Sequence, residues 1–444
     1  MLGVRSGFLR ICIGIMAFWV GFASTPAYPA TDYIVRRLNA DTQLITFGNG
    51  ARLIIQETHE APLVAMDIWI AAGSSRETSL NNGCAHFLEH LIFKGSIGQT
   101  NGFLDLLAES AGSIVDATTN RDWAHYYTTV AGRYWEPLYS ALGQAIFKPA
   151  LNDKDIETER SVIQDEIARN SDNEYRYIVQ RLFSEWYKNL SYALPITGSF
   201  ASINSIRPDQ VKAFHKQWYI GPNIVFVLVG DIDPEQAIKL TSELIKGIPS
   251  GKRVIETFIL PKSGKRIEDN GKFKISSVAI AFPAPSALSP KEAVALDFIL
   301  SLLTDQQVGR LNSCLKEIAD TIKGTYTTTV KPGLMAVVVN TKEANLKLCE
   351  AALLGQFKSL REETLSSVEM ETVRRRMLGS ALFEAETFGG RANLLGFYAT
   401  IADPDIAIRY IDMVRSLTPR DIKSAAERYL DPSLQTTLIL HGGK

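Results

Sequence analysis

Hydrophobic side chains recur in this sequence at two spacings, and their order predicts a mixture of strands and helices. Residues 43–47 and 52–57 alternate in strand fashion on either side of Gly48-Asn49-Gly50-Ala51, which predicts an antiparallel hairpin with Asn-Gly in the turn. The other elements expected nearby are strands within 62–71 and 114–130 and helices over 83–93 and 103–110. This clustered order predicts an α+β fold, with helices packed on one face of a mainly antiparallel sheet.

One arrangement of residues occurs twice, 211 positions apart. In residues 206–219 and again in 417–430, a proline opens an amphipathic helix that ends at an aromatic side chain, and a short apolar strand follows each helix. The repetition predicts two homologous domains that enclose a cleft, although helix-then-strand pairs also recur by chance in unrelated folds. The expected domain bounds are 33–248 and 272–444, with a linker over 249–271, where prolines, glycines and lysines interrupt the periodicity.

The first 27 residues have the layout of a secretory signal peptide. Arg5 and Arg10 precede an uncharged apolar run over 11–23, and the small residues Thr25 and Ala27 are placed for cleavage after Ala27. A run of this length is short for a bilayer span, so we expect a periplasmic or secreted protein with no membrane span in the mature chain. The alternative is a membrane anchor formed by an uncleaved signal.

Charge and cysteine content exclude some classes of protein. The 47 basic and 48 acidic residues give a formal net charge of −1, so no basic surface for nucleic acid or anionic lipid is expected. Cys12 falls in the predicted signal, which leaves three cysteines and at most one disulfide, between Cys314 and Cys349. Cys84 would lie on a different helix face from His86, which favours burial as a small hydrophobic residue.

The helix expected over 83–93 carries the strongest chemical signal. His86 and His90 are four residues apart, so a helix presents both imidazoles on one face, within reach of a single metal ion. Glu89 lies beside the second histidine, where its carboxylate can take a proton from a metal-activated water. The order His-x-x-Glu-His is the inverted form of the common zinc protease motif and leaves the ion one protein ligand short. The alternative is a pair of solvated or core histidines.

A second acidic helix is expected over 151–167. Glu159 and Glu166 are seven residues apart, which places them two turns along nearly the same helix face. One helix could therefore offer two carboxylates to one site. A solvated acidic face is the alternative that the spacing leaves open.

Together these stretches resemble the pitrilysin (insulinase) family of zinc peptidases, which includes the mitochondrial processing peptidase. The matching residues are Gly73-Ser74-Ser75-Arg76-Glu77, then 85–96 around the motif, then Glu159 to Glu166. The resemblance implies that His86, His90 and Glu166 bind one Zn²⁺ per chain and that Glu89 is the general base. It implies that Glu159 is a further catalytic acid that supports the site without binding the metal.

The resemblance extends to residues 112–119, which are similar to the family's substrate-binding edge strand. An unpaired strand edge beside the metal would hold an extended peptide by main-chain hydrogen bonds. Asp116 stands where family members usually have asparagine, and we expect an acidic group there to favour basic substrates. His125 follows in the next expected strand, where packing among aromatic residues is favoured over metal binding.

The second half of the chain has no copy of the metal motif, and its single histidine is His441. Family members often carry Arg-Gly-Leu-Ala-Tyr there, whereas residues 321–327 keep only a Lys-Gly and Tyr326, which is interpreted as an ordinary strand residue. This imperfect match indicates a homodimer, or a heterodimer with a homologous subunit. The expected function is a zinc endopeptidase acting on peptides or unfolded segments, and the alternative is a non-catalytic homologue that serves as a structural or assembly subunit.

Overall fold

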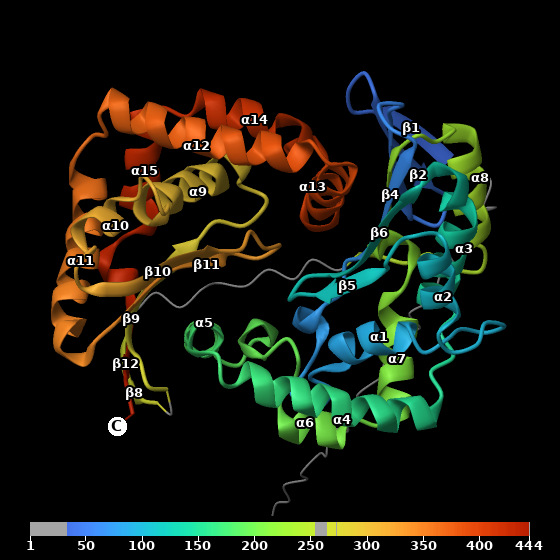
Figure 1. Cartoon of the computed structure of the whole chain (residues 1–444), viewed down its shortest axis with the longest axis horizontal. Helices are drawn as coiled ribbons and strands as arrows, with labels where there is room; N and C mark the ends of the chain where they lie inside the picture. The colour runs from blue at the N-terminus through green and yellow to red at the C-terminus, as the bar shows by residue number, and fades with distance from the viewer. Residues whose placement is uncertain (1–32, 254–263, 272, 444) are drawn as a thin grey trace, which may run out of the picture.

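Two β-sheets organise the chain, one in each half (Figure 1). The computed structural model describes residues 33–253, 264–271 and 273–443, so the predicted signal peptide lies outside the described residues. The first sheet contains β1 (Tyr33–Arg37), β2 (Thr42–Phe47), β3 (Arg52–Glu57), β4 (Leu63–Ile70), β5 (Asp116–Thr119), β6 (Ala124–Ala131) and β7 (Ile224–Gly230). The second contains β8 (Arg266–Asn270), β9 (Ser276–Ala284), β10 (Ala319–Tyr326), β11 (Gly333–Thr341) and β12 (Thr436–His441).

Helices surround both sheets. Those of the first half are α1 (Cys84–Ile92), α2 (Phe103–Ser110), α3 (Trp135–Phe147), α4 (Asp153–Asn170), α5 (Glu174–Trp186), α6 (Phe200–Ser205), α7 (Pro208–Trp218) and α8 (Pro234–Leu244). Those of the second half are α9 (Pro290–Thr304), α10 (Arg310–Cys314), α11 (Leu346–Glu362), α12 (Ser367–Ala385), α13 (Phe388–Ile401), α14 (Asp405–Ser416) and α15 (Pro419–Tyr429). The predicted hairpin is confirmed, because β2 and β3 pair antiparallel, and α1 and α2 lie where helices were predicted.

The predicted duplication is visible in the sheets. The first sheet has the order β1-β2-β3-β7-β4-β6-β5, and the second has the order β10-β11-β9-β12-β8. In reverse, the second sheet has the order β8-β12-β9-β11-β10. Taken in chain order, β8 to β12 therefore occupy the same places as β3 to β7 in the order β3-β7-β4-β6-β5 of the first sheet. Directions also agree, because β3 pairs parallel with β7 and β8 pairs parallel with β12, while the remaining pairs are antiparallel. Each sheet is therefore mainly antiparallel, as predicted.

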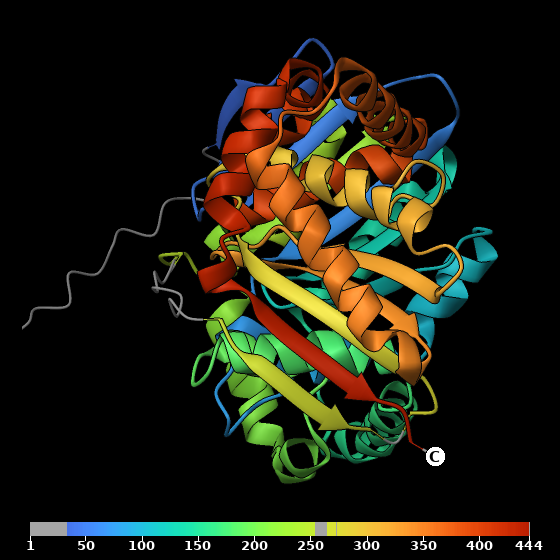
Figure 2. The ribbon, with the colours of Figure 1, turned by 90° about the vertical axis from the view of Figure 1, so that its left-hand side faces the viewer.

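The second sheet includes a strand that the sequence did not indicate. Residues Arg266–Asn270 form β8, whose backbone pairs with β12 (Figure 2, where β9, β12 and β8 lie side by side in yellow, red and olive). The stretch 249–271 was expected to be a linker, but its residues 266–270 belong to the sheet. Polar composition hid the strand, since an edge strand needs only one partner and little apolar surface. The domain bounds themselves stay a prediction.

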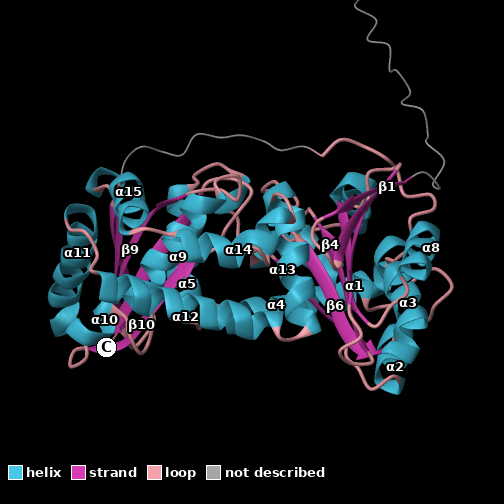
Figure 3. Ribbon diagram, turned by 90° about the horizontal axis from the view of Figure 1, so that it is seen from above, coloured by secondary structure: helices cyan, strands magenta, loops and turns pink. Residues whose placement is uncertain are grey.

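The central strand of the first sheet, β7, is apolar and is buried on both faces. Along β7, Ile224, Phe226 and Leu228 face a core shared with α1, α3, α7 and α8, and the alternate valines face the other way. Helices of the first half, among them α1, α3, α7 and α8, therefore cover one face of the first sheet, as predicted (Figure 3).

The opposite face of the first sheet is covered by a helix from the second half. In α13, Leu395 and Ala399 pack in one core with Val227 of β7 and Ala65 of β4. Figure 3 shows α13 on one side of the first sheet and α1 and α3 on the other. A cavity of about 470 Å³ lies between β6 and the start of α13.

The second sheet receives a helix from the first half in return. Ile178, Leu182 and Trp186 of α5 pack in one core with Ala281 of β9 and Leu438 of β12. The other face of this sheet packs against α9, α11, α12 and α15 of its own half. The two halves thus exchange one helix each, which the sequence pattern did not reveal.

Two further expectations can be compared with the described residues. Cys84 is buried in the core beside the motif, as expected, but Cys314 and Cys349 are both free thiols and the predicted disulfide is absent. Cys314 is exposed at the end of α10, whereas Cys349 is buried within α11. None of the helices in the described part of the chain combines the length and the hydropathy that a bilayer crossing requires.

Candidate metal centre

Two helices bring His86, His90 and Glu166 together. The histidines lie one turn apart on α1, and Glu166 lies on α4, which packs against α1. The Oε2 atom of Glu166 is 3.5 Å from Nε2 of His86 and 3.6 Å from Nε2 of His90. The three ligand atoms lie within 4.8 Å of one another, and no other such group of metal-ligating side chains occurs among the described residues.

The two separations from Glu166 fit one metal ion. Two ligand atoms that each lie about 2.1 Å from a tetrahedral Zn²⁺ are about 3.4 Å apart. The two distances from Glu166 match that value, and two neutral imidazoles with one carboxylate form an ordinary donor set for zinc. A fourth position would remain for water or substrate.

The charge states of the ligands suit a cation. Burial lowers the pKa of His86 to about 4, so this imidazole is neutral near pH 7 and can donate a lone pair. The hydrogen bond from His90 holds the pKa of Glu166 at about 2, so this carboxylate is ionised. Burial opposes a proton on His90, but Glu166 and Glu159 raise its pKa, and a bound cation would take the place of that proton.

Glu89 lies on the same helix as the histidines. It lines one pocket together with His86 and Glu166. Its Oε2 atom is buried and has no hydrogen-bond partner among the described residues. Burial raises the pKa of Glu89, which makes its carboxylate a better proton acceptor than an exposed one. An unpartnered buried carboxylate oxygen is costly, so it indicates a group that is completed by water or substrate.

Glu159 contacts His90 at the ring nitrogen that points away from Glu166. It is 3% exposed, and its Oε2 atom lies 3.0 Å from Nδ1 of His90. Its other oxygen forms an ion pair of 2.9 Å with Nζ of Lys94. A carboxylate on the far nitrogen of a ligating histidine fixes the tautomer and the ring orientation. Lys94 is part of the stretch that carries the family resemblance, but no role for it was predicted from the sequence.

The start of α1 is held by Glu77, another residue to which the sequence assigned no role. Its carboxylate accepts hydrogen bonds from the backbone N–H groups of Gly83 and Ala85, at 2.8 and 2.7 Å, and from the side-chain amide of Asn82 at 2.8 Å. Burial raises the pKa of Glu77, and these donors act against the rise. Because α1 has no side-chain cap of its own, Glu77 supplies the acceptor that a helix N-terminus needs.

A pocket of about 590 Å³ opens beside the metal group, lined among others by His86, Glu89, Glu166 and Thr119. Thr119 ends β5, which is the last strand of the first sheet and leaves one backbone edge unpaired by strands in the described chain. Asp116 begins the same strand, is exposed, and accepts a hydrogen bond of 3.0 Å from the hydroxyl of Tyr127. The predicted edge strand therefore lies next to the predicted metal ligands.

His125 and Tyr326, for which the sequence favoured packing and strand roles, lie outside the metal group. His125 is buried, stacks on Trp69 with 3.6 Å between ring centroids, and its Nε2 atom lies 2.9 Å from Asp67. Its packing among aromatic rings agrees with the prediction. Tyr326 is the last residue of β10, and its hydroxyl donates to the backbone oxygen of Pro285, as expected for a strand residue.

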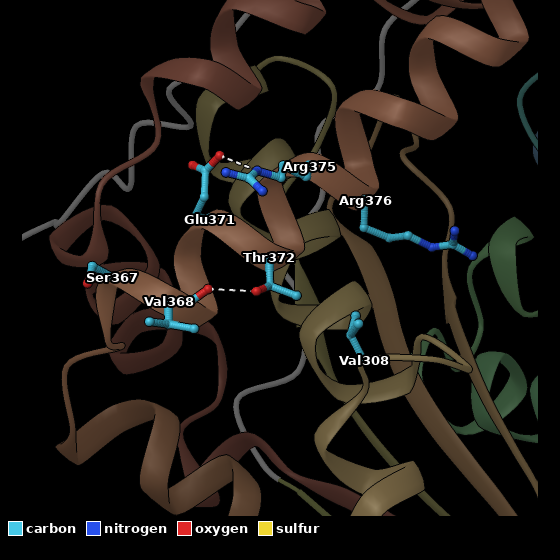
Figure 4. A pocket seen from close by; sticks show the side chains of 7 residues that line it. All are labelled: Val308, Ser367, Val368, Glu371, Thr372, Arg375 and Arg376. Carbon is cyan, nitrogen blue, oxygen red and sulfur yellow. Dashed lines mark hydrogen bonds and ion pairs between the residues drawn. The ribbon is translucent and has the colours of Figure 1, made fainter.

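A hollow on the surface of the second half is of another kind. It has a volume of about 650 Å³ and lies along α12, where Glu371 and Arg375 form an ion pair of 2.7 Å (Figure 4). Val368 and Thr372 also line it, and the described lining includes neither histidine nor cysteine. Its charges are exposed and already paired, so it offers no chemistry comparable to the group on α1 and α4.

Comparisons with known proteins identify the family of this chain. Residues 52–199 match the family model described as insulinase (peptidase family M16), and residues 205–377 match the model described as peptidase M16 inactive domain. The solved structure of a protease from Helicobacter pylori shares the fold, with a TM-score of 0.84, 19% identity, and coverage of 90% of this chain and 99% of that one. The periplasmic protease PqqL from Escherichia coli has a TM-score of 0.72 at 17% identity, covering 92% of this chain and 48% of that one.

Curated relatives include both peptidases and proteins with other names. Core protein I of the ubiquinol-cytochrome-c reductase complex of Euglena gracilis is 29% identical over 57% of this chain and 51% of its own length. The beta subunit of the mitochondrial-processing peptidase of Mus musculus is 30% identical over 45% of this chain and 41% of its own length. The matches thus span about half the length of these mitochondrial relatives or less. The uncharacterized zinc protease YmxG of Bacillus subtilis is 22% identical over 79% of this chain and 86% of its own length.

The two family models match adjacent parts of the chain, residues 52–199 and 205–377, and both are models of the same peptidase family. The protein therefore belongs to the insulinase peptidase family, M16.

Proposed function

We propose that this chain is a zinc-dependent endopeptidase that hydrolyses peptides or unfolded segments. The observation that carries the proposal is the convergence of His86, His90 and Glu166, with a buried, unpartnered carboxylate oxygen of Glu89 beside them; His86, Glu166 and Glu89 line one pocket. His86, His90 and Glu166 would hold the ion. Zinc bound there would act as a Lewis acid on the scissile carbonyl and would make water easier to deprotonate.

The protein's own side chains would perform the proton transfers. Glu89 accepts a proton from the attacking water and later donates it to the leaving amine, and burial, which raises its pKa, makes its carboxylate a stronger proton acceptor. Glu159 keeps the far nitrogen of His90 occupied, and Lys94 keeps Glu159 in place. Neither of these two residues needs to touch the substrate.

Substrate would bind as an extra strand. An extended peptide can pair with the free backbone edge of β5 and place alternate side chains in the 590 Å³ pocket. Binding through backbone groups requires an extended segment, so folded proteins are poor substrates. Exposed Asp116 on the same strand would favour basic side chains, and cleavage of matched acidic and basic peptides by wild type and Asp116→Asn tests this preference.

The decisive experiment compares wild type with Glu89→Gln. We expect the variant to keep zinc, measured by elemental analysis, and to lose turnover of an unstructured peptide by about 1000-fold, as for loss of a general base. Glu157→Gln on exposed α4 surface is the matched control and should retain both properties. Equal turnover by wild type and Glu89→Gln would refute the assignment.

A second candidate is a non-catalytic homologue with a structural or assembly role. Two observations favour it: one relative is named as a core protein of a respiratory complex, and residues 205–377 match a model named as an inactive domain. Absence of both zinc and turnover in wild type, with or without partner subunits, would establish this second function. The complete set of ligands and base argues for the enzyme.

Partner and location are part of the proposal. We propose that a homologous subunit, identical or different, completes the substrate chamber, since relatives include a named subunit of a processing peptidase. Full peptidase activity of the isolated monomer would remove the need for it. We also propose export to the periplasm or beyond, as one fold neighbour is a periplasmic protease, and N-terminal sequencing of the mature protein tests cleavage after Ala27.

A further inference from the structure

We propose that Asn170 and Arg176 are positioning residues that hold Glu166 in its metal-facing orientation. This inference rests on the metal site proposed above. It concerns the one ligand that lies on α4, and it links that ligand to a helix anchored on the other half of the molecule.

Both oxygens of Glu166 are engaged. Oε2 faces the two histidines, at 3.5 and 3.6 Å, and Oε1 accepts a hydrogen bond of 3.1 Å from the side-chain amide of Asn170. The two residues are four apart on α4, so they lie on one helix face. Without the amide, the half-buried carboxylate could rotate and exchange its oxygens at the metal position.

Arg176 fixes the orientation of that amide. Its Nη1 atom donates to Oδ1 of Asn170 at 2.6 Å. A guanidinium can only donate and a carboxylate can only accept, so Asn170 must present its oxygen to Arg176 and its nitrogen to Glu166. The order Arg176, Asn170, Glu166 therefore has one hydrogen-bonding arrangement, and the cation polarises the amide toward the carboxylate.

The position of Arg176 is set by the second half of the chain. Arg176 lies in the first turn of α5, where Asn173 caps the helix by accepting from the backbone N–H of Arg176 at 2.9 Å. Neighbouring residues of α5 reach the second sheet: Glu174 accepts from Asn340 at 2.9 Å, and Tyr177 donates to Asp269 at 2.9 Å. The apolar side of α5 is buried on that sheet as well. The hydrogen bond from Arg176 thus ties a metal ligand of one half to the packing of the other.

Arg176 also lines the 590 Å³ pocket, so a direct role in substrate binding is the competing explanation. The two roles differ in what they change. A positioning residue alters the affinity for zinc in the absence of substrate, because outer hydrogen bonds to a ligand typically contribute about 10–100-fold in metal affinity. A substrate-binding residue alters KM and leaves zinc affinity unchanged.

The experiment measures the zinc dissociation constant of the full chain by competition with a chromogenic chelator. We expect Arg176→Gln and Asn170→Ala each to weaken zinc binding by about 10-fold or more, and the double variant to weaken it little further, because both break one relay. Arg176→Lys should recover part of the loss, since an ammonium can still donate to Oδ1. Arg169→Gln is the matched control, because Arg169 is an exposed cation of the same helix end.

The melting temperature of the metal-free variants separates positioning from a folding defect, and it should equal that of metal-free wild type. Zinc affinities of Arg176→Gln and Asn170→Ala equal to wild type, or an equal loss in Arg169→Gln, would overturn the proposal. A raised KM with unchanged zinc affinity would assign Arg176 to substrate binding. If wild type itself binds no zinc, the proposed function fails together with this inference, whereas zinc binding that ignores Arg176 leaves the proposed function intact.

Discussion

The two halves of this chain share a five-strand order but carry different chemistry on the helices that follow the corresponding strands β4 and β9. In the first half, α1 follows β4 and presents His86, Glu89 and His90. In the second half, α9 follows β9, and more than half of its residues are buried, including Val294 and Phe298 of the apolar core. One architecture thus supports a candidate metal centre in one copy and an apolar helix in the other, so function depends on a few side chains and not on the fold.

The largest expected effect tests whether metal binding is confined to the first half. His90→Ala removes one of three protein ligands. If each ligand contributes a third of a binding free energy on the order of 10 kcal/mol, zinc binding should weaken by about 3 kcal/mol, or roughly 200-fold. His441→Ala removes the histidine of the second half, which pairs with Glu343, and should leave zinc affinity unchanged. Equilibrium dialysis distinguishes the two, and equal losses would break the contrast between the halves.

The next prediction concerns helix packing. An added methyl group at Gly396 of α13 would lie 2.0 Å from Nε1 of Trp69 in the first sheet, so Gly396→Ala should lower the free energy of unfolding by about 2–3 kcal/mol. Gly379→Ala in α12 meets no atom within 4 Å and should stabilise by up to about 1 kcal/mol through helix propensity. Urea denaturation measures both. A Gly396→Ala variant as stable as wild type would show that α13 does not pack closely on the first sheet.

A smaller effect is expected from the residue behind His90. Glu159→Gln removes the charge that orients the imidazole and pairs with Lys94, so zinc affinity should fall by about 10-fold. Glu157→Gln, two residues away and exposed, should change nothing. Chelator competition provides the measurement, and wild-type affinity in Glu159→Gln would remove Glu159 from the centre.

The smallest effect concerns the N-terminus of the motif helix. Glu77→Gln turns an amide nitrogen toward backbone donors and should cost about 1–2 kcal/mol of unfolding free energy, because one buried donor loses its acceptor. Ser366→Ala, at the exposed cap of α12 in the second half, should cost about 1 kcal/mol or less. Thermal unfolding of the metal-free proteins compares the caps, and a neutral Glu77→Gln would show that α1 forms without it.

Local patterns were sufficient for the elements and for part of the centre. The spacing of His86 and His90 predicts a shared helix face, and the Asn-Gly turn predicts the first hairpin, because both depend on a few neighbouring residues. Glu166 required the family resemblance, since its distance from His86 in sequence carries no geometric information. The structure places it 3.5 Å from that histidine, while its role as a ligand stays a prediction.

The rest depended on contacts between distant segments. Lys94 and Glu77 are ordinary charged residues in the sequence, and only folding brings them to Glu159 and to the start of α1. The relay from Arg176 depends on the turn between α4 and α5. The sheet against which α13 packs could not be predicted for a different reason. A helix that is apolar on most sides is expected to be buried, but its composition does not indicate which sheet covers it.

The exchanged helices have a consequence for any attempt to divide this molecule. A chain severed between α8 and β8 would yield two fragments, each holding the helix that the other fragment's sheet requires. Expressed alone, either fragment would expose to water the valine, alanine and leucine side chains of the sheet face that the missing helix covers. Such a fragment would tend to aggregate. Expressed together, the fragments should reassociate, because each completes the other, so the halves are interlocked partners and not independent modules.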